Sequence, residues 1–129
     1  MGFKIRNVTR NTMLCQEASL ADRFRRRAMG LMFRKGWEEF DGLLLSPCRS
    51  IHTFWMRMEI DVCFLDSEQR VLKALAFLGP WRAARGGRDS HATLELPAGT
   101  LERTGTRAGD RLAVDRPADR RIAAGPVEG

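Results

Sequence analysis

Apolar and polar residues alternate over several short stretches of the chain, and this pattern predicts strands. Phe3 and Ile5 alternate with charged residues in the opening stretch, as in a strand with one buried face. Residues 13–15 follow a polar turn at 9–12, so we expect them to return as a second strand that pairs with the first. The chain is therefore expected to begin with a hairpin.

Continuous apolar runs predict further, more deeply buried strands. They cover residues 43–45, 60–65 and 71–78. The last two flank the polar turn 66–69, so we expect one antiparallel hairpin whose two strands are both central in a sheet. A short helical piece at 100–104 and a last strand at 111–115 complete the pattern, and 46–56 is the least regular stretch.

Residues 93–96 form one more predicted strand. Leu94 and Leu96 alternate with Glu95, so we expect the leucines to point into the core and Glu95 to point to solvent. From such a position Glu95 could meet Arg82 across the sheet. Asp66 is expected to stabilise the hairpin turn that precedes this region.

One longer helix is predicted near the N-terminal hairpin. Ser19 is a suitable N-cap residue, and an apolar stripe at helical spacing follows it. The stripe consists of Leu20, Phe24, Ala28 and Leu31. We therefore expect a helix at about residues 20–33, with its arginines facing water.

These elements predict an α+β fold. Strands outnumber helices and lack a regular βαβ alternation, which favours a mostly antiparallel sheet or a small β-barrel with one main packed helix and a short second helical piece. A chain of 129 residues has room for one core. We place a single domain at 1–116 and expect 117–129, which lose periodicity, to form a flexible tail.

Composition and charge narrow the classes of function. The net charge of +6 and the isoelectric point near 10.2 predict a basic surface that attracts polyanions. The three cysteines are far apart and form no CxxC pair, so free thiols are expected rather than a disulfide framework. No signal peptide and no apolar run of membrane-spanning length is recognised, so a cytoplasmic location is expected.

Four ordered motifs resemble those of a known family. They are Ala28–Arg34, Asp41–Leu45, Ser50–Met56 with Ile60–Asp66, and Leu94–Gly99 followed by Gly109-Asp110. Over about residues 10–115 the chain thus resembles domain-of-unknown-function family 192 (DUF192). The resemblance implies a compact, mostly β domain without an established activity or assigned catalytic residues. Many relatives look exported or membrane-anchored, whereas this chain lacks a signal and has Glu59 where they usually carry proline.

The segment around His52 is the best candidate site. A ligand site needs a few convergent polar groups beside an apolar wall, often with an aromatic ring for stacking. The candidate ligand-binding residues are Arg49, His52, Trp55, Arg57, Asp61, Trp81, Arg82 and Glu95. The alternative interpretation is structural: His52 and Asp61 satisfy backbone groups, while 54–56 fill the core.

Three functions follow as hypotheses. The first is a non-catalytic module that binds a small polar ligand or an envelope component, such as a sugar or a peptide segment, through the 48–61 loop; the envelope link rests on the resemblance alone. The second is a hydrolase in which His52 acts with Asp61, Glu95 or Cys48. The third is anion or nucleic-acid binding through Arg23, Arg26 and Arg27.

The remaining possibilities are less favoured by the sequence. No aromatic is interleaved with the arginines of 23–27 for base stacking, so nucleic acid is not the expected partner. A metal site would require the fold to gather Cys48, His52 and His91. No metal or other cofactor is therefore predicted, and the sequence indicates no oligomeric state.

Overall fold

The computed structural model describes residues 2–21, 37 and 40–115, and in these ranges strands dominate. The elements are β1 (Phe3–Asn7), β2 (Thr12–Ala21), β3 (Gly42–Leu45), β4 (Ser50–His52), β5 (Ile60–Leu65), β6 (Val71–Leu78), β7 (Ala83–Arg85), β8 (Ala92–Pro97), α2 (Thr100–Thr104) and β9 (Leu112–Asp115). The prediction of a mostly β chain with a short helical piece at 100–104 is confirmed. No helix among these residues has the length and apolar character needed to cross a bilayer.

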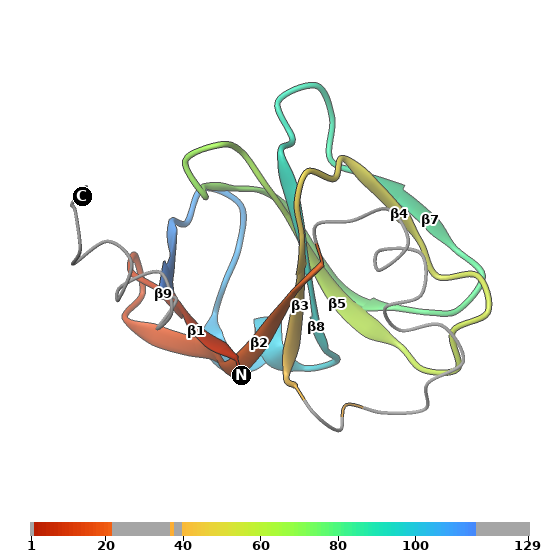
Figure 1. Cartoon of the computed structure of the whole chain (residues 1–129), viewed down its shortest axis with the longest axis horizontal. Coiled ribbons are helices and arrows are strands. Elements are labelled where there is room, and N and C mark those ends of the chain that lie inside the picture. The colour runs from red at the N-terminus through yellow and green to blue at the C-terminus, as the bar shows by residue number, and fades with distance from the viewer. Residues whose placement is uncertain (1, 22–36, 38–39, 116–129) are drawn as a thin grey trace.

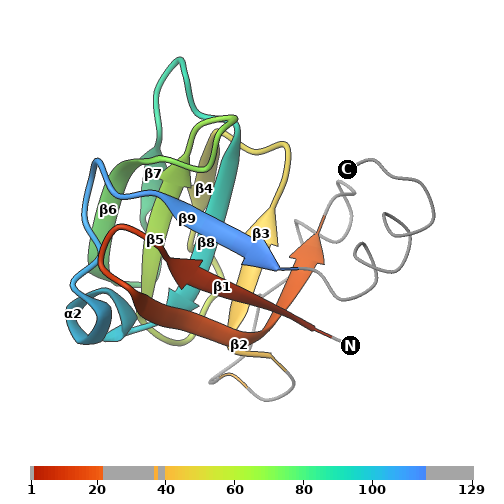
Figure 2. The same ribbon diagram turned by 90° about the vertical axis from the view of Figure 1, so that its left-hand side faces the viewer.

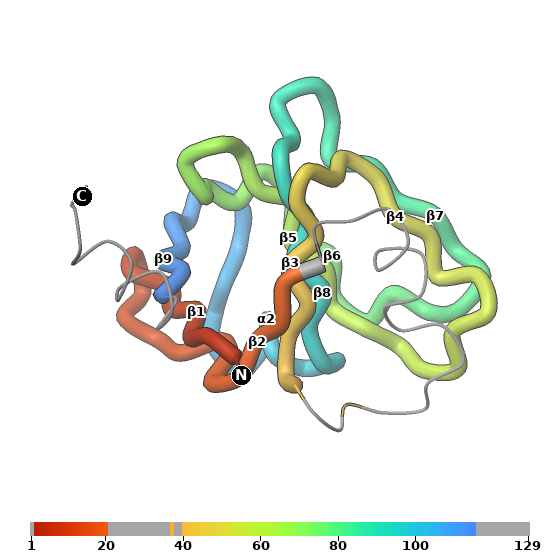
Figure 3. Tube along the Cα trace, in the orientation of Figure 1, coloured from red at the N-terminus to blue at the C-terminus, as the bar shows by residue number. Residues whose placement is uncertain are grey.

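Seven strands form one curled sheet, and two form a small ribbon beside it. The sheet runs in the order β6-β5-β8-β3-β2-β1-β9, and the ribbon pairs β4 with β7 (Figure 1). Strands β1, β2 and β9 cross in front of β5 and β8 in Figure 2, so the sheet curls into a half-barrel. The trace in Figure 3 shows the same curl, with the ribbon on the side away from β1 and β9.

The predicted hairpins are confirmed, but one strand lies elsewhere in the sheet. β1 pairs with β2 and β5 pairs with β6, both antiparallel, as the sequence pattern indicates. The expectation that both strands of the second hairpin are central is wrong. β5 lies between β6 and β8, whereas β6 is the edge strand and leaves Phe77 46% exposed. An apolar run is therefore compatible with an edge position when one face still packs on the core.

The predicted helix start at Ser19 is also wrong. Ser19 and Leu20 belong to β2 and pair in parallel with Leu43 and Leu44 of β3. Pairing with a buried neighbouring strand outweighs the weak local preference of Ser19 for capping a helix. The rest of the expected helix, residues 22–33, and the expected tail, residues 117–129, lie outside the described residues.

Both faces of the central strands are buried, and this explains their continuous apolar runs. The inner face packs inside the curl, where Ile5, Leu94 and Leu96 are fully buried. The outer face of β3 and β5 packs against the ribbon, and Phe64 and Ile51 belong to this second cluster. The ribbon thus forms a covering layer over one side of the half-barrel.

The Asp41-Gly42 step leads into β3 and fixes it against β2. The Asp41 carboxylate accepts hydrogen bonds from the backbone N–H groups of Gln16 (2.8 Å) and Glu17 (2.9 Å). A side chain at position 42 would collide with the Cys15 thiol, so only glycine allows β3 to approach β2 this closely. The Asp41-Gly42 step is therefore a site of close strand packing.

Candidate functional site

Two loops meet beside the ribbon at the end of the molecule farthest from β1 and β9. Residues 53–56 follow β4 and residues 79–82 precede β7, and His52 pairs with Ala83 where the two strands lie side by side (Figure 1). The Thr53 N–H donates to the Arg82 carbonyl at 2.8 Å, and the Trp81 N–H donates to the Thr53 carbonyl at 3.0 Å. Segments about thirty residues apart in the sequence are therefore joined through their backbones.

The Thr53 side chain adds a second set of bonds between these loops. Thr53 is fully buried, and its hydroxyl donates to the Gly79 carbonyl at 2.7 Å. The same oxygen accepts the Arg82 N–H at 2.8 Å. A buried hydroxyl that both donates and accepts fixes its surroundings in one arrangement.

Four aromatic side chains gather on the loops held by Thr53, and we call them the aromatic platform: His52, Phe54, Trp55 and Trp81. Phe54 stacks between His52 and Trp81, with ring centroids 4.7 Å and 5.5 Å away. Trp55 meets Trp81 edge to face at 4.7 Å. Phe54, Trp55 and Trp81 are 39%, 51% and 56% exposed, so the platform faces solvent.

The backbone of the platform is held in an uncommon conformation. Trp55 has φ 70° and Trp81 has φ 61°, in the left-handed region that bulky residues rarely occupy. Such residues cost on the order of 1–3 kcal/mol each and persist only where the surroundings fix them. Here the Thr53 hydrogen bonds supply that constraint, and the strained backbone presents both indoles on one surface.

Removing the Thr53 hydroxyl is expected to loosen the platform. Thr53→Val keeps the shape of the side chain but leaves the Gly79 carbonyl and the Arg82 N–H without this partner. We expect a loss of about 2 kcal/mol in unfolding free energy, together with a shift in tryptophan emission. Urea unfolding followed by fluorescence measures both. Thr53→Ser, which retains the hydroxyl, is the matched control; equal midpoints for Thr53→Val and the natural chain would show that these bonds do not hold the loops.

Five exposed arginines lie on the same two segments. They are Arg49, Arg57, Arg82, Arg85 and Arg88. Residues 49–58 and 79–88 contain no aspartate or glutamate. Within the described part of the chain none of the five forms a salt bridge, and the only polar contact of these guanidinium groups is from Arg49 to the Ser90 carbonyl at 3.2 Å.

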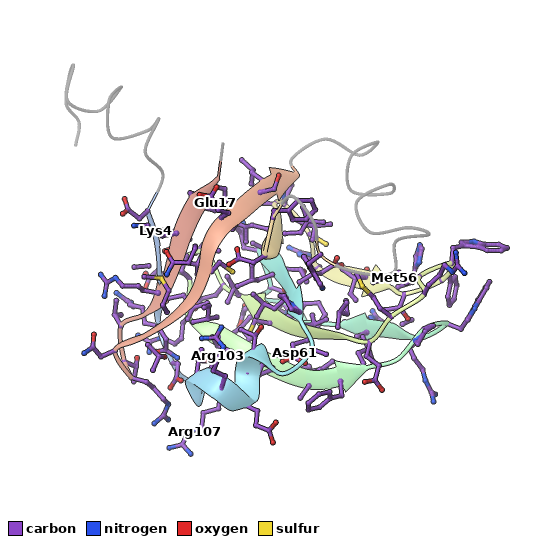
Figure 4. The ribbon with its side chains drawn as sticks, turned by 90° about the horizontal axis from the view of Figure 1, so that it is seen from below. Lys4, Glu17, Met56, Asp61, Arg103 and Arg107 are labelled. Carbon is purple, nitrogen blue, oxygen red and sulfur yellow. The ribbon has the colours of Figure 1, made fainter. Side chains whose placement is uncertain are left out.

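Asp61 does not join this surface. It is fully buried, and its carboxylate accepts backbone N–H groups from Phe77 (2.9 Å), Gly99 (3.1 Å) and Leu101 (2.8 Å). Figure 4 shows it beside α2, well away from Met56. The interpretation of Asp61 as a partner of backbone amides is therefore confirmed, and its inclusion among ligand-binding residues conflicts with its burial.

The expectation that Glu95 points to solvent is wrong. It is 6% exposed and lies in the sheet between Leu43 and Val62, on the face covered by the ribbon. Burial raises the pKa of its carboxyl group to about 8. A meeting with Arg82 is not observed, since Arg82 lies in the exposed loop beyond the ribbon. The alternation of apolar and polar residues correctly places Glu95 and the leucines on opposite faces of β8, but the outer face is buried as well.

The thiols and histidines form no catalytic or metal-binding group among the described residues. The Cys48 thiol donates to the Ser50 carbonyl at 3.1 Å, and the His52 Nδ1 accepts the Phe54 N–H at 3.3 Å. No three metal-ligating side chains gather in the parts of the chain that are described, so Cys48, His52 and His91 do not form such a cluster. Burial raises the pKa of Cys15 far above its usual range and that of Cys63 to about 12, which keeps both thiols protonated.

The fold therefore unites part of the predicted site and adds residues that sequence reasoning missed. It brings His52, Trp55 and Trp81 together among the exposed arginines, including Arg57. Phe54 was considered only as a core residue, although alternation from Ile51 onward indicated that it faces solvent. Arg23, Arg26 and Arg27, the alternative anion-binding residues, lie outside the described residues.

Comparison with known proteins gives one consistent family. The model of DUF192, described as an uncharacterised ACR, matches residues 6–114. A UPF0127 protein of Pyrococcus furiosus is 37% identical over 113 residues, which cover 85% of this chain and 97% of that protein. A UPF0127 protein of Pyrococcus horikoshii is 36% identical over 109 residues, which cover 82% and 94%.

Solved structures share the fold. A protein of unknown function from Novosphingobium aromaticivorans aligns with a TM-score of 0.72 and 20% identity, over 86% of this chain and 82% of that one. A putative transcription regulator from Sinorhizobium meliloti aligns with a TM-score of 0.74 and 21% identity, over 87% and 91%. At these identities the likeness bears on the fold alone.

Proposed function

Because the chain belongs to DUF192, a family described as uncharacterised, we propose its function from its own geometry: it is a non-catalytic module that binds a small polar ligand on the aromatic platform. The ligand class is a sugar or a short peptide segment, as found in cell-envelope components. The 48–61 loop supplies His52, Phe54 and Trp55, and the 79–82 loop supplies Trp81.

The exposure of the platform is the observation that carries this proposal. Large aromatic side chains normally lose most of their surface on folding, yet Phe54, Trp55 and Trp81 keep between 39% and 56% of theirs. They are also fixed, since a fully buried Thr53 holds both loops. Rigid and exposed rings offer a large contact area at a small cost in conformational entropy on binding.

The polar groups around the platform suit a ligand with many hydrogen-bonding positions. Arg57 and Arg82 are exposed and without a salt bridge in the described residues, so they can donate to hydroxyl, carbonyl or carboxylate oxygens. The ring faces meanwhile favour an apolar face on the ligand. A sugar ring combines an apolar face with a polar rim, and a short peptide also offers both.

Hydrolysis gains no comparable support. Catalysis by His52 would need a nucleophile or a carboxylate beside it. Within the described ranges His52 contacts Phe54 and pairs with Ala83 across the ribbon. Asp61 and Glu95 are both buried in the sheet, and the Cys48 thiol bonds to a backbone carbonyl.

Removing part of the platform is expected to abolish binding without unfolding the chain. His52→Ala combined with Trp55→Ala removes two exposed side chains, so the melting temperature should change by only a few degrees. We expect an array of neutral and acidic oligosaccharides and soluble muropeptides to show at least one binder for the natural chain. Titration calorimetry should then give at least a tenfold weaker affinity for the double variant.

The control for this experiment is Val8→Ala, which removes an exposed apolar side chain from the β1–β2 turn, far from the platform. It should bind as the natural chain does. A double variant that binds normally, or an array on which no probe binds the natural chain, contradicts the proposal. A collapse of the melting transition would instead assign His52 and Trp55 to the core.

A further inference from the structure

Positive charge predominates around the aromatic platform, although the exposed carboxylates Glu59 and Asp89 directly follow the two segments that carry it. Five exposed arginines flank the platform on residues 49–58 and 79–88, and these segments hold no carboxylate. Two arginines elsewhere on the described surface form salt bridges: Arg10 pairs with Asp110 at 2.9 Å, and Arg111 pairs with Glu68 at 3.3 Å. The ribbon and its loops thus carry five exposed arginines that form no salt bridge among the described residues.

This charge is placed where a bound molecule would meet it. Arg57 directly follows the 53–56 loop, Arg82 lies in the 79–82 loop, and Arg85 pairs with Ser50 across the ribbon. Each guanidinium offers a planar fork of donors that matches the two oxygens of a carboxylate. Concentrating such groups on one surface costs repulsion between them, which an anionic ligand relieves.

The arrangement of the rings favours one class of anionic ligand over another. Single-stranded nucleic acid needs several separate aromatic faces on which successive bases stack. Here His52, Phe54 and Trp81 stack on one another with centroids 4.7 Å and 5.5 Å apart, so their inner faces are already occupied. The outer faces and edges remain, and these suit a single ring lying across the platform rather than a run of bases.

We propose that the ligand of the platform is an acidic saccharide, whose ring lies against Trp55 and Trp81 while its carboxylate pairs with Arg57 or Arg82. This inference rests on the proposed function and adds the charge of the ligand to it. Removing both guanidinium groups should therefore weaken the binding of a charged sugar more than the binding of a neutral one. Added salt should weaken the charged interaction selectively as well.

The test compares three oligosaccharides of equal length: an oligogalacturonate, its fully methyl-esterified form and a neutral maltooligosaccharide. Titration calorimetry with the natural chain is expected to show the oligogalacturonate binding at least tenfold more tightly than the other two. Arg57→Gln with Arg82→Gln should reduce that preference to about twofold or less, because glutamine cannot form the charged pair. Trp81→Ala should weaken all three probes, because it removes the ring and leaves every arginine in place.

A charge-matched control removes two arginines elsewhere. Arg6→Gln with Arg107→Gln gives the same net charge, and both residues are exposed outside the ribbon; Figure 4 shows Arg107 beside α2, away from Met56. This variant should keep the preference for the oligogalacturonate. If it loses the preference equally, the effect is that of overall charge and the inference is wrong.

The remaining outcomes separate this inference from the proposed function. Equal affinity for the acidic and neutral probes overturns the inference and leaves the proposed function standing. Tighter binding of a single-stranded oligonucleotide, lost in Arg57→Gln with Arg82→Gln, replaces the saccharide with a nucleic acid. Failure of every saccharide, peptide and oligonucleotide to bind overturns both proposals.

Discussion

The free energy of unfolding of the natural chain is expected to fall by on the order of 4 kcal/mol as the pH rises from about 5 to about 9. Replacing Glu95 with glutamine is expected to abolish this fall. Glu95 is buried between Leu43 and Val62, and burial raises the pKa of its carboxyl group to about 8 from an ordinary value of 4.5. The folded chain therefore holds this proton over a range in which the unfolded chain has released it.

The direction of the effect follows from proton binding. Below pH 4.5 both states carry the proton, and stability is at its full value. Between 4.5 and about 8 the folded state binds more protons than the unfolded state, so the free energy of unfolding decreases as the pH rises. Above about 8 the folded state must hold a buried carboxylate, and the loss is complete. Glutamine has nearly the same shape and no titratable proton, so its profile should be flat here.

Urea unfolding at a series of pH values measures this effect. Glu102→Gln is the matched control, because Glu102 is exposed on α2 and its variant should retain the slope of the natural chain. The carboxyl group of Asp110 does not interfere with this measurement. Burial raises its pKa, but hydrogen bonds from Asn7 and Arg10 outweigh this and lower the pKa, so the stability that Asp110 contributes is lost only at acid pH. A natural chain equally stable at pH 5 and pH 9 would contradict the prediction.

Asp61→Ala is expected to destabilise the chain by about 4 kcal/mol at neutral pH. The Asp61 carboxylate accepts three backbone N–H groups, from the β6 residue Phe77, from Gly99 and from Leu101 at the start of α2. At Phe77 strand β6 carries one residue more than the facing part of β5, so its N–H has no strand partner. Alanine would leave all three donors without this acceptor, and that of Leu101 buried.

Chemical unfolding of three variants tests this role. Asp61→Asn keeps one acceptor oxygen and should lose roughly half as much stability as Asp61→Ala. Asp66→Ala is the control, because Asp66 also accepts two backbone N–H groups, from Glu68 and Arg70, but in an exposed hairpin turn where water can replace it. It should cost less than about 1 kcal/mol. Equal losses for Asp61→Ala and Asp66→Ala would show that the buried bonds are not special.

Local patterns predicted the hairpins because hairpins depend on neighbouring residues. Alternation at Phe3 and Ile5, and the turn at Asp66, act over a few positions, and the structure confirms both pairs of strands. Ser19 shows the limit of such reasoning. Its capping preference is local, but its conformation is decided by pairing with Leu43, a residue far along the chain.

The error at Glu95 has a different physical origin. Alternation correctly placed Glu95 and Leu94 on opposite faces, and the wrong step was to assume that only one face is covered. The ribbon that covers the other face contains Ala83–Arg85, a three-residue stretch with no strand pattern of its own. A covering layer built from such a segment leaves no periodic signal in the sequence.

The candidate site was predicted in part for the same reasons. His52 and Trp55 stood out because they lie in one irregular segment, and Trp81 could be added only as an isolated aromatic. Their contact depends on Thr53, which carries no functional signal in the sequence but bonds to Gly79 and Arg82. Much of the resemblance to DUF192, including Asp61 and Gly99, reflects residues that hold the fold rather than residues that meet a ligand.

The pairing of β1 with β9 has a consequence for synthesis on the ribosome. Lys4 lies opposite Asp115, so the first of the described strands along the chain is flanked by the last of them. Until residues 112–115 leave the exit tunnel, one edge of β1 lacks its neighbour, and only then can the sheet acquire its complete order. The domain should therefore reach its protease-resistant state only after residues 112–115 have left the tunnel, in one late step, whereas the β5–β6 hairpin can form earlier.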